Sequence, residues 1–362
     1  MNKPQIPKIT NTEAETPKTS KNWFWSILFV VIALGSIFAV VVQCKSFSLS
    51  DFSGYIKGAS PLWLAISLLS MFAYIVFEGL ALLIICRAFG YRTSFSRGYI
   101  YSASDIYFSA ITPSATGGQP ASAYFMMKDG MSGMMVTTAL LVNLCMYTLS
   151  IVVIGLLCFS FRFDLFLNYS VLSKILIVAG TLIQIGLAVF FSMLLLKEKL
   201  LHKISSSVLS FLCKIRLLRH KSAKQEKLDK YMENYRRYST IISKHHKTLW
   251  FVFLFNFLQR VTQIAITMFV YMATTGKSFI EAVDLWFFQG YTVLGANCMP
   301  VPGGIGVSDY LMLDGFGSVM SEHSAVNLEL LSRALSFYFC VIICGISVLI
   351  RYLTLKKRGS NK

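Results

Sequence analysis

The sequence predicts an all-α integral membrane protein with six full spanning helices and two re-entrant Gly/Pro hairpins, about eight hydrophobic segments in all, arranged as an inverted repeat. Three observations support this fold class. Charged residues make up 14% of the chain and mean hydropathy is +0.60, whereas about 25% of a soluble domain is charged. Apolar runs long enough to span a bilayer recur along the chain. Two further apolar segments are interrupted by glycine and proline.

The apolar runs define the elements in chain order. Residues 1–21 are polar and are expected to form a disordered cytoplasmic tail. A membrane domain is expected over residues 22–355, followed by a basic cytoplasmic tail at 356–362. A helix of about 20 apolar residues spans a bilayer. Spanning helices are therefore predicted at Trp23–Gln43, Leu62–Cys86, Met134–Phe159, Val171–Leu196, Leu249–Thr274 and Leu330–Ile350.

The two interrupted segments cover about 99–127 and 279–319. The first contains TPSATGGQP at 112–120, and the second contains PVPGGIGV at 300–307. The prolines explain why a helix stops there. Irregular backbone at membrane depth survives only where it is buried in protein or lines a wet cavity. These two hairpins are therefore the predicted working site.

Lys and Arg set the orientation. The loop at 197–247 carries 14 Lys/Arg against four acids, and the C-terminal tail is also basic. Because basic loops stay on the cytoplasmic side, both termini are predicted to be cytoplasmic. Counting crossings from there, the first interrupted segment begins and ends on the cytoplasmic side. The second begins and ends on the outer side.

An offset of 186 residues aligns Gly117-Gly118 with Gly303-Gly304 and carries the order helix–hairpin–helix from one half to the other. The halves cover about 61–160 and 247–350, with opposite predicted orientation. Paired interrupted segments in two inverted halves are the pattern of a transporter with its site near the midplane. The alternative is that both motifs are loops between short helices.

The hairpin chemistry suits a lipid phosphate. Glycine pairs let backbone amides approach an anion, and helix N-termini add positive partial charge. The expected substrate-binding residues of the first hairpin are Thr112, Pro113, Thr116, Gly117, Gly118, Gln119, Pro120 and Tyr124. Those of the second are Pro300, Pro302, Gly303, Gly304, Gly306 and Tyr310.

Ionisable residues inside spans are rare and mark functional sites. Glu78 and Arg260 occupy helices related by the offset and could form an ion pair, either to bind substrate or to fix packing. Arg333 is a third candidate, although it lies near enough to the interface to snorkel. Asp105 and Asp309 flank the hairpins.

Other features argue for lipid and against enzyme chemistry. The net charge of +17 fits basic loops and anionic lipid, and no nucleic-acid partner is expected. Residues 228–242 show apolar side chains at helical spacing among Lys and Arg, which indicates an interfacial helix that anchors the loop. Every histidine lies outside the spans, and the sequence has no HExxH or P-loop. No catalytic residue, metal or cofactor is therefore predicted.

The two hairpin motifs, together with Tyr124 and Arg333, resemble a known family. Over about Trp23–Leu355 the chain is similar to the integral-membrane region of bacterial lysylphosphatidylglycerol synthases, the multiple peptide resistance factors, and their stand-alone relatives. The resemblance implies a multi-pass protein of the bacterial cytoplasmic membrane that moves aminoacylated phosphatidylglycerol outward. Such movement lowers the negative surface charge and confers resistance to cationic peptide antibiotics.

The resemblance also sets the alternatives. In the fused proteins a soluble C-terminal aminoacyltransferase domain is catalytic, and this chain is expected to lack it. It could instead be the membrane component of a phosphatidylglycerol lysyltransferase system that needs a soluble aminoacyltransferase partner, or a non-transporting scaffold. Membrane phospholipids are the expected partners, and a homo-oligomer is also compatible with the sequence. The lipid stays open, because other stand-alone members are linked to different lipids, including polyprenyl-linked sugars.

Overall fold

The computed structural model describes residues 49–112, 115–197, 245–275, 278–299 and 306–360, together with residues 301 and 304 and scattered positions between 200 and 242. Every regular element in these ranges is helical. The predicted N-terminal tail, the predicted spanning helix at Trp23–Gln43, and most of the basic loop with its predicted interfacial helix lie outside the described residues. So do Pro113, Pro300, Pro302, Gly303 and the final two residues of the predicted basic tail.

Five helices in the described part of the chain are long and apolar enough to cross a membrane. Each contains one of the predicted apolar runs, so these five predictions are confirmed as long apolar helices. The Val171–Leu196 run matches its helix at both ends. The five are α3 (Pro61–Ala88), α6 (Gly133–Phe161), α8 (Val171–Leu196), α11 (His246–Thr274) and the continuous helix formed by α14 (Glu322–Arg333), η3 (Ala334–Phe339) and α15 (Cys340–Ser360).

Each interrupted segment folds as two short helices joined by its Gly/Pro motif. The first pair is α4 (Phe95–Ile111) and α5 (Gly118–Lys128), and the second is α12 (Phe279–Ala296) and α13 (Val307–Gly317). Two short helices, α2 (Leu49–Lys57) and α7 (Phe163–Leu167), were not predicted, since nine and five residues are too few to give a hydropathy signal.

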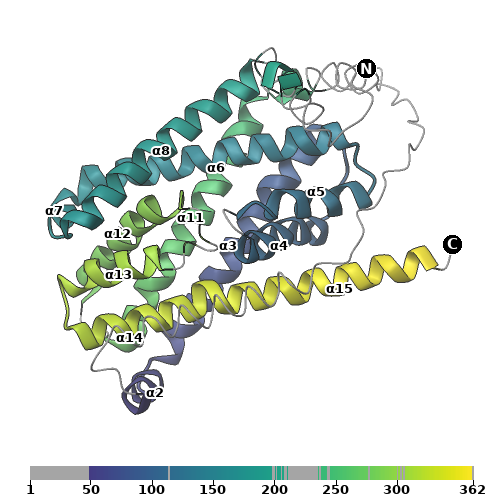
Figure 1. Ribbon diagram of the computed structural model, residues 1–362. Coiled ribbons are helices and arrows are strands. Elements are labelled where there is room, and N and C mark those ends of the chain that lie inside the picture. Colours follow the sequence, from purple (N-terminus) through teal and green to yellow (C-terminus); the bar gives the residue numbers. More distant parts are fainter. Residues whose placement is uncertain are drawn as a thin grey trace.

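The element order of the first half returns in the second. Shifted by 186 residues, α3 would span 247–274, and α11 spans His246–Thr274. Packing follows the same order, because α4 packs on α3 and α5 on α4, as α12 packs on α11 and α13 on α12. In Figure 1, α6 and α8 run side by side along one edge, α15 follows the opposite edge, and the two short pairs lie between them.

The two pairs open toward opposite ends of the molecule. Asp129, just after α5, accepts a hydrogen bond from Tyr101 at 2.7 Å and pairs with Arg351 of α15. The start of α4 and the end of α5 therefore meet at the C-terminal end of α15. At the other end, the backbone N–H of Ser170 donates to Asp314 of α13 at 2.9 Å. Figure 1 accordingly shows α12 and α13 nearer α7, and α4 and α5 nearer the C-terminus.

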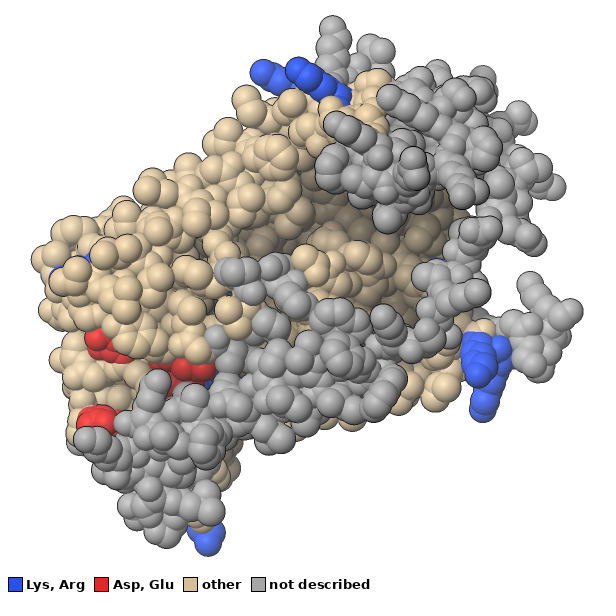
Figure 2. Space-filling view, in the orientation of Figure 1, with Lys and Arg blue, Asp and Glu red and all other residues tan. Residues whose placement is uncertain are grey.

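The outer surface is apolar along the long helices. Leu182 of α8 and Ile346 of α15 are among many exposed aliphatic side chains. Among the described residues of the face in Figure 2, acidic side chains gather near α13 and α14, and basic ones lie beside the C-terminal ends of α8 and α15 and beside α2. A broad apolar band bounded by charged ends is the surface expected of a protein that sits in lipid.

Candidate functional site

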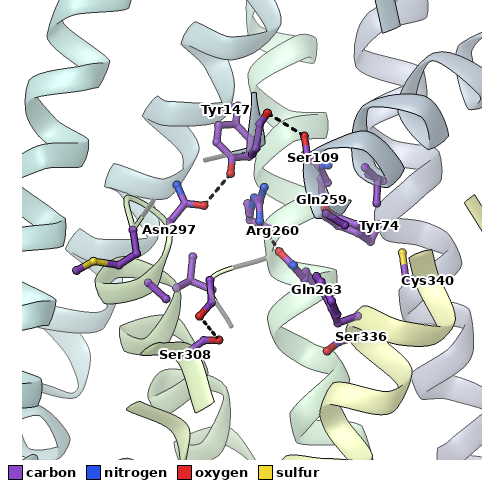
Figure 3. A pocket seen from close by; sticks show the side chains of 18 of the residues that line it. Tyr74, Ser109, Tyr147, Gln259, Arg260, Gln263, Asn297, Ser308, Ser336 and Cys340 are labelled. Carbon is purple, nitrogen blue, oxygen red and sulfur yellow. Dashed lines mark hydrogen bonds between the residues drawn. The ribbon is translucent and has the colours of Figure 1, made fainter. Parts of the chain in front are cut away.

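A cavity of about 600 Å³ lies between the two helix pairs. Helices α3, α4, α6, α11, α12 and the η3 turn all contribute to its wall, so both halves of the chain line it. The first hairpin contributes Ala115 and Gln119, and the second contributes Val301 and Gly304. Figure 3 shows polar side chains from these elements converging on the cavity. The two Gly/Pro motifs thus meet at one site although 186 residues separate them.

Arg260 is the most central charge of the cavity (Figure 3). It is 8% exposed, and its guanidinium lies 4.3 Å from the ring centre of Tyr147 and 5.8 Å from that of Tyr74. It also donates to Gln263, one turn farther along α11. A cation over aromatic faces is stabilised by the ring quadrupoles without being neutralised. Arg260 therefore keeps its charge available to a ligand.

The sequence explains why Arg260 faces inward. Asn256, Gln259, Arg260 and Gln263 recur at helical spacing and form a polar stripe on the otherwise apolar α11. Such a stripe is costly against lipid and favourable against other polar groups. The stripe accordingly packs against the polar faces of neighbouring helices, where Asn256 donates to Asn143 of α6 at 3.0 Å.

Glu78 shares the cavity with Arg260 without pairing with it. Its carboxylate accepts from Ser102 of α4 at 3.1 Å and from Gln259 of α11 at 2.9 Å. Among the described residues, no ion pair joins Glu78 to Arg260. The ion pair between Glu78 and Arg260, which the sequence left open, is therefore not formed. Glu78 of α3 is instead hydrogen-bonded to Gln259, the residue before Arg260 on α11.

The glycines of the first hairpin are needed for close packing. A Cβ at Gly118 would lie 1.9 Å from the Asp105 carboxylate and 2.1 Å from the Ser109 hydroxyl. Thr112 accepts a hydrogen bond from the backbone N–H of Gly117 at 2.8 Å, which closes the turn. These glycines hold α5 against α4. They do not form the open anion nest that the sequence suggested.

Among the described residues of TPSATGGQP, Gln119 is the one that brings a polar side chain to the cavity lining. Its amide donates to Asp105 of α4 at 3.3 Å. Tyr124 lies apart, with its ring 5.3 Å from that of Phe125 and the Lys128 ammonium 5.7 Å from its centre. The described part of the motif therefore contributes the Gln119 amide to the site.

The second hairpin uses glycine for its backbone conformation. Gly304 and Gly306 have φ of +64° and +85°, a region that other residues enter only at a cost of about 1–2 kcal/mol. The Gly306 N–H donates to Asp309 at 2.8 Å at the start of α13. Tyr310 turns away and shares a 3.0 Å hydrogen bond with Ser170. Of these residues, Gly304 lines the cavity.

Arg333 fixes the second hairpin in place. It is 8% exposed, pairs with Asp309 and donates to Ser308, while Glu329 lies 3.6 Å from its Nε. The alternative that Arg333 snorkels to the interface is therefore wrong, because three groups of the protein interior hold its guanidinium. Part of the side chain still lines the cavity.

The predicted site residues thus divide into three groups. Those that line the cavity are Glu78, Gln119, Arg260, Gly304 and Arg333. The second group consists of predicted site residues that the structure describes but that do not line the cavity: Thr112, Thr116, Gly117, Gly118, Pro120, Tyr124, Gly306 and Tyr310. Pro113, Pro300, Pro302 and Gly303 lie outside the described residues.

Sequence reasoning missed several polar wall residues. Tyr74, Tyr147, Gln289 and Asn297 line the cavity, and Tyr147 donates to Asn297 at 2.9 Å. The offset of 186 could have found the tyrosines, since it places Tyr74 opposite Arg260, and Tyr147 opposite Arg333. Nothing in the sequence distinguishes Gln289 or Asn297 from other polar residues of similar apolar helices.

The cavity presents unused hydrogen-bonding capacity. Arg260 Nε, Gln259 Oε1 and Gln289 Oε1 are buried and have no hydrogen-bond partner within the described part of the chain. Unpaired buried polar atoms cost about 1–3 kcal/mol each. Such groups beside a cavity are suited to a polar ligand with both acceptor and donor groups.

Comparison with known proteins gives one family. Residues 23–344 match the family model described as the lysylphosphatidylglycerol synthase TM region. A search of curated proteins finds no match for the chain.

Proposed function

The chain belongs to the family of lysylphosphatidylglycerol synthase transmembrane regions, and from this we propose that it is a lipid translocase of the bacterial cytoplasmic membrane. Its proposed cargo is an anionic or aminoacylated phospholipid of the lysylphosphatidylglycerol kind. The observation that carries the proposal is the shared cavity, which is lined by two interrupted helix pairs that open toward opposite ends of the molecule.

The proposed architecture is an inverted repeat. It is supported by the repeated element order, by the agreement of α3 and α11 at an offset of 186 residues, and by the matching packing of α4 and α12. In transporters of this construction, discontinuous helices from both halves form the substrate site near the midplane. The two Gly/Pro pairs are the discontinuous helices of the proposed repeat.

The cavity fits a lipid headgroup. Its volume of about 600 Å³ lies within the range of small-molecule sites. Arg260 offers a cation with a free N–H, and neighbouring amides offer acceptors. A phosphate can bind the guanidinium, while the amino group of an aminoacylated headgroup can bind the amide oxygens. The acyl chains would stay against the exposed aliphatic surface of the long helices.

The proposed orientation places both termini in the cytoplasm. The basic C-terminal end of α15 and the open end of the α4–α5 pair meet at Asp129, so they share one side of the molecule. By the positive-inside rule that side is cytoplasmic. Outward movement of a lysylated lipid would lower the negative surface charge and weaken the binding of cationic peptides.

Reconstitution tests the proposal directly. Purified protein in liposomes is expected to move fluorescent phosphatidylglycerol or its lysylated form between leaflets faster than empty liposomes. Arg260→Ala should lower this rate at least tenfold, the effect of losing one charge-assisted contact. Arg92→Ala is the matched control, because Arg92 is exposed in the loop before α4. Folded protein that moves neither lipid would overturn the proposal.

A second function is favoured by the family description, which names a synthase. The chain would then be the membrane component of a lysyltransferase system and would bind a soluble aminoacyltransferase. Affinity purification from native membranes distinguishes the two functions. Copurification of lysyltransferase activity supports the second, whereas lipid movement by the isolated chain supports the first.

A further inference from the structure

A pair of buried carboxyl groups lies in the cavity wall. Glu78 of α3 is 5% exposed and Asp105 of α4 is 9% exposed. Both line the cavity, and they lie next to each other, because Ser102, one turn before Asp105 on α4, donates to Glu78 at 3.1 Å. The motif-based reasoning had placed Asp105 only as a flank of the first hairpin. The structure places it at the junction between the hairpin and the central helices.

Two carboxyl groups in this arrangement need a proton. An ionised carboxylate only accepts hydrogen bonds, so a hydrogen bond between two carboxyl groups requires that one of them carry the hydrogen. Two buried negative charges in contact also repel strongly, and such pairs hold one proton between them. The geometry of Glu78 and Asp105 therefore indicates a singly protonated pair.

The side chains that donate hydrogen bonds to the two carboxyl groups are neutral. Ser102 and Gln259 donate to Glu78, while Ser109 and Gln119 donate to Asp105. These bonds hold the pair in place, and none of the donors brings a positive charge that would balance a second ionised carboxylate.

The titratable groups that face the pair come from four helices. Arg260 of α11 is the cation among them, and the others are neutral hydroxyl or thiol groups at neutral pH. These others are Tyr74 of α3, Tyr147 of α6, and Cys340 and Cys344 of α15. With one proton the pair carries a charge of −1, which Arg260 balances. Without the proton, the two carboxylates carry a charge of −2, which exceeds the single positive charge of Arg260.

We propose that Glu78 and Asp105 share one exchangeable proton, and that this proton and an anionic headgroup at Arg260 bind the cavity cooperatively. The proposal rests on the proposed lipid-binding function of the cavity. An extra negative charge beside Arg260 repels an incoming phosphate and competes for the guanidinium. The shared proton removes this charge and therefore raises the affinity of the cavity for the anion. Because linkage is reciprocal, the bound anion raises the affinity of the pair for the proton by the same factor.

The first hairpin is mechanically connected to the pair. Gln119 donates to Asp105, and Gly118 packs directly against its carboxylate. Loss of the proton changes the charge on one of the side chains that hold the hairpin against α4. The proton therefore changes both the charge that the ligand meets and a contact that anchors the hairpin.

Infrared spectroscopy tests the shared proton without any lipid. Wild-type protein in detergent at neutral pH should show the C=O stretching band of a protonated carboxyl group. The double variant Glu78→Gln/Asp105→Asn should show a weaker band than the wild type while retaining the wild-type thermal transition, and any part contributed by the buried Glu329 should stay. Asp314→Asn is the matched control, since Asp314 lies on α13 outside the cavity lining, and it should retain the band. Identical carboxyl bands in wild-type and double-variant protein would overturn the proposal.

Proton uptake tests the cooperativity. At a pH high enough for the pair to have lost its proton, adding short-chain phosphatidylglycerol to weakly buffered protein should raise the pH in the wild type and leave it unchanged in the double variant. The affinity for this lipid should fall about tenfold as the pH rises and the pair loses its proton. Lipid binding without proton uptake would contradict the proposal.

The translocation assay separates the two ideas. If the protein moves no lipid but shows the infrared carboxyl band and the proton uptake, the proposed translocase function is refuted and the proposed proton site is supported. Movement that keeps the same pH dependence in the double variant would refute the proton site and leave the translocase standing.

Discussion

At the scale of single residues, the guanidinium of Arg260 is stabilised by the rings of Tyr74 and Tyr147 and not by an ion pair with Glu78. A planar guanidinium stacks on a ring, and a compact ammonium does not reproduce that geometry. We predict that Arg260→Lys lowers lipid translocation about tenfold, although the charge is conserved. Tyr147→Phe should remain near wild type, because it keeps the ring and removes only the hydrogen bond to Asn297. Translocation in proteoliposomes measures both variants, and equal rates for Arg260→Lys and wild type would contradict the stacking argument.

Gly118 gives a prediction about stability. The added methyl group in Gly118→Ala would overlap Asp105 and Ser109, and overpacking of this kind costs about 1–3 kcal/mol. Gly186→Ala is the control, because a Cβ there meets nothing within 4 Å. Thermal denaturation in detergent should show a lower Tm for Gly118→Ala alone. A Tm for Gly118→Ala that matches the wild type would show that α5 can move away from α4 at little cost.

At the scale of elements, the joint between α13 and α14 depends on one buried ion pair. Arg333→Ala would leave Asp309 charged and buried at 4% exposure, a change that costs about 3–5 kcal/mol. Adding Asp309→Asn should recover part of the loss, and denaturant unfolding of both variants measures it. Arg97→Ala is the comparison, since its pair with Asp129 is 3.9 Å long and its side chain is 40% exposed. That variant should lose less than about 1 kcal/mol.

The helices were predictable to the extent that apolar length determines them. Val171–Leu196 matches α8 because polar residues end the run on both sides. The predicted last helix at Leu330–Ile350 was too short, because α14 begins at Glu322 with a polar first turn that hydropathy discounts. The π-helical turn at Ala334–Phe339 left no mark in the sequence.

At the scale of the whole molecule, the proposed topology predicts which loops face which side. Single cysteines at Arg92 and Lys128, in a background without accessible native thiols, should both react with an impermeant maleimide from the cytoplasmic side. These positions flank the α4–α5 pair. Cysteines at Ser278 and Ser318, which flank α12 and α13, should react from the outside. Labelling of Arg92→Cys and Lys128→Cys from opposite sides would show that the first pair crosses the membrane.

The candidate site was predictable in location but not in composition. Glycine and proline within apolar sequence located the hairpins, and Arg260 and Glu78 were visible as charges within spans. The role of Gly118 required coordinates, because its contact with Asp105 depends on the crossing of α4 and α5. Tyr147 was hidden for a similar reason, since a tyrosine in an apolar helix is unremarkable until a cation lies over its ring.

The π turn between α14 and α15 gives the cavity two walls of unequal stiffness. On one side α6 runs as an uninterrupted rod from Gly133 to Phe161. On the other side the continuous helix formed by α14, η3 and α15 contains a π-helical turn at Ala334–Phe339, and a π turn is a place where a helix can bend. Ser336 and Phe337 of this π turn line the cavity, so a bound ligand would contact the π turn directly. We therefore expect α14 and α15 to change their orientation relative to α6 when a ligand binds, with the bend at the π turn.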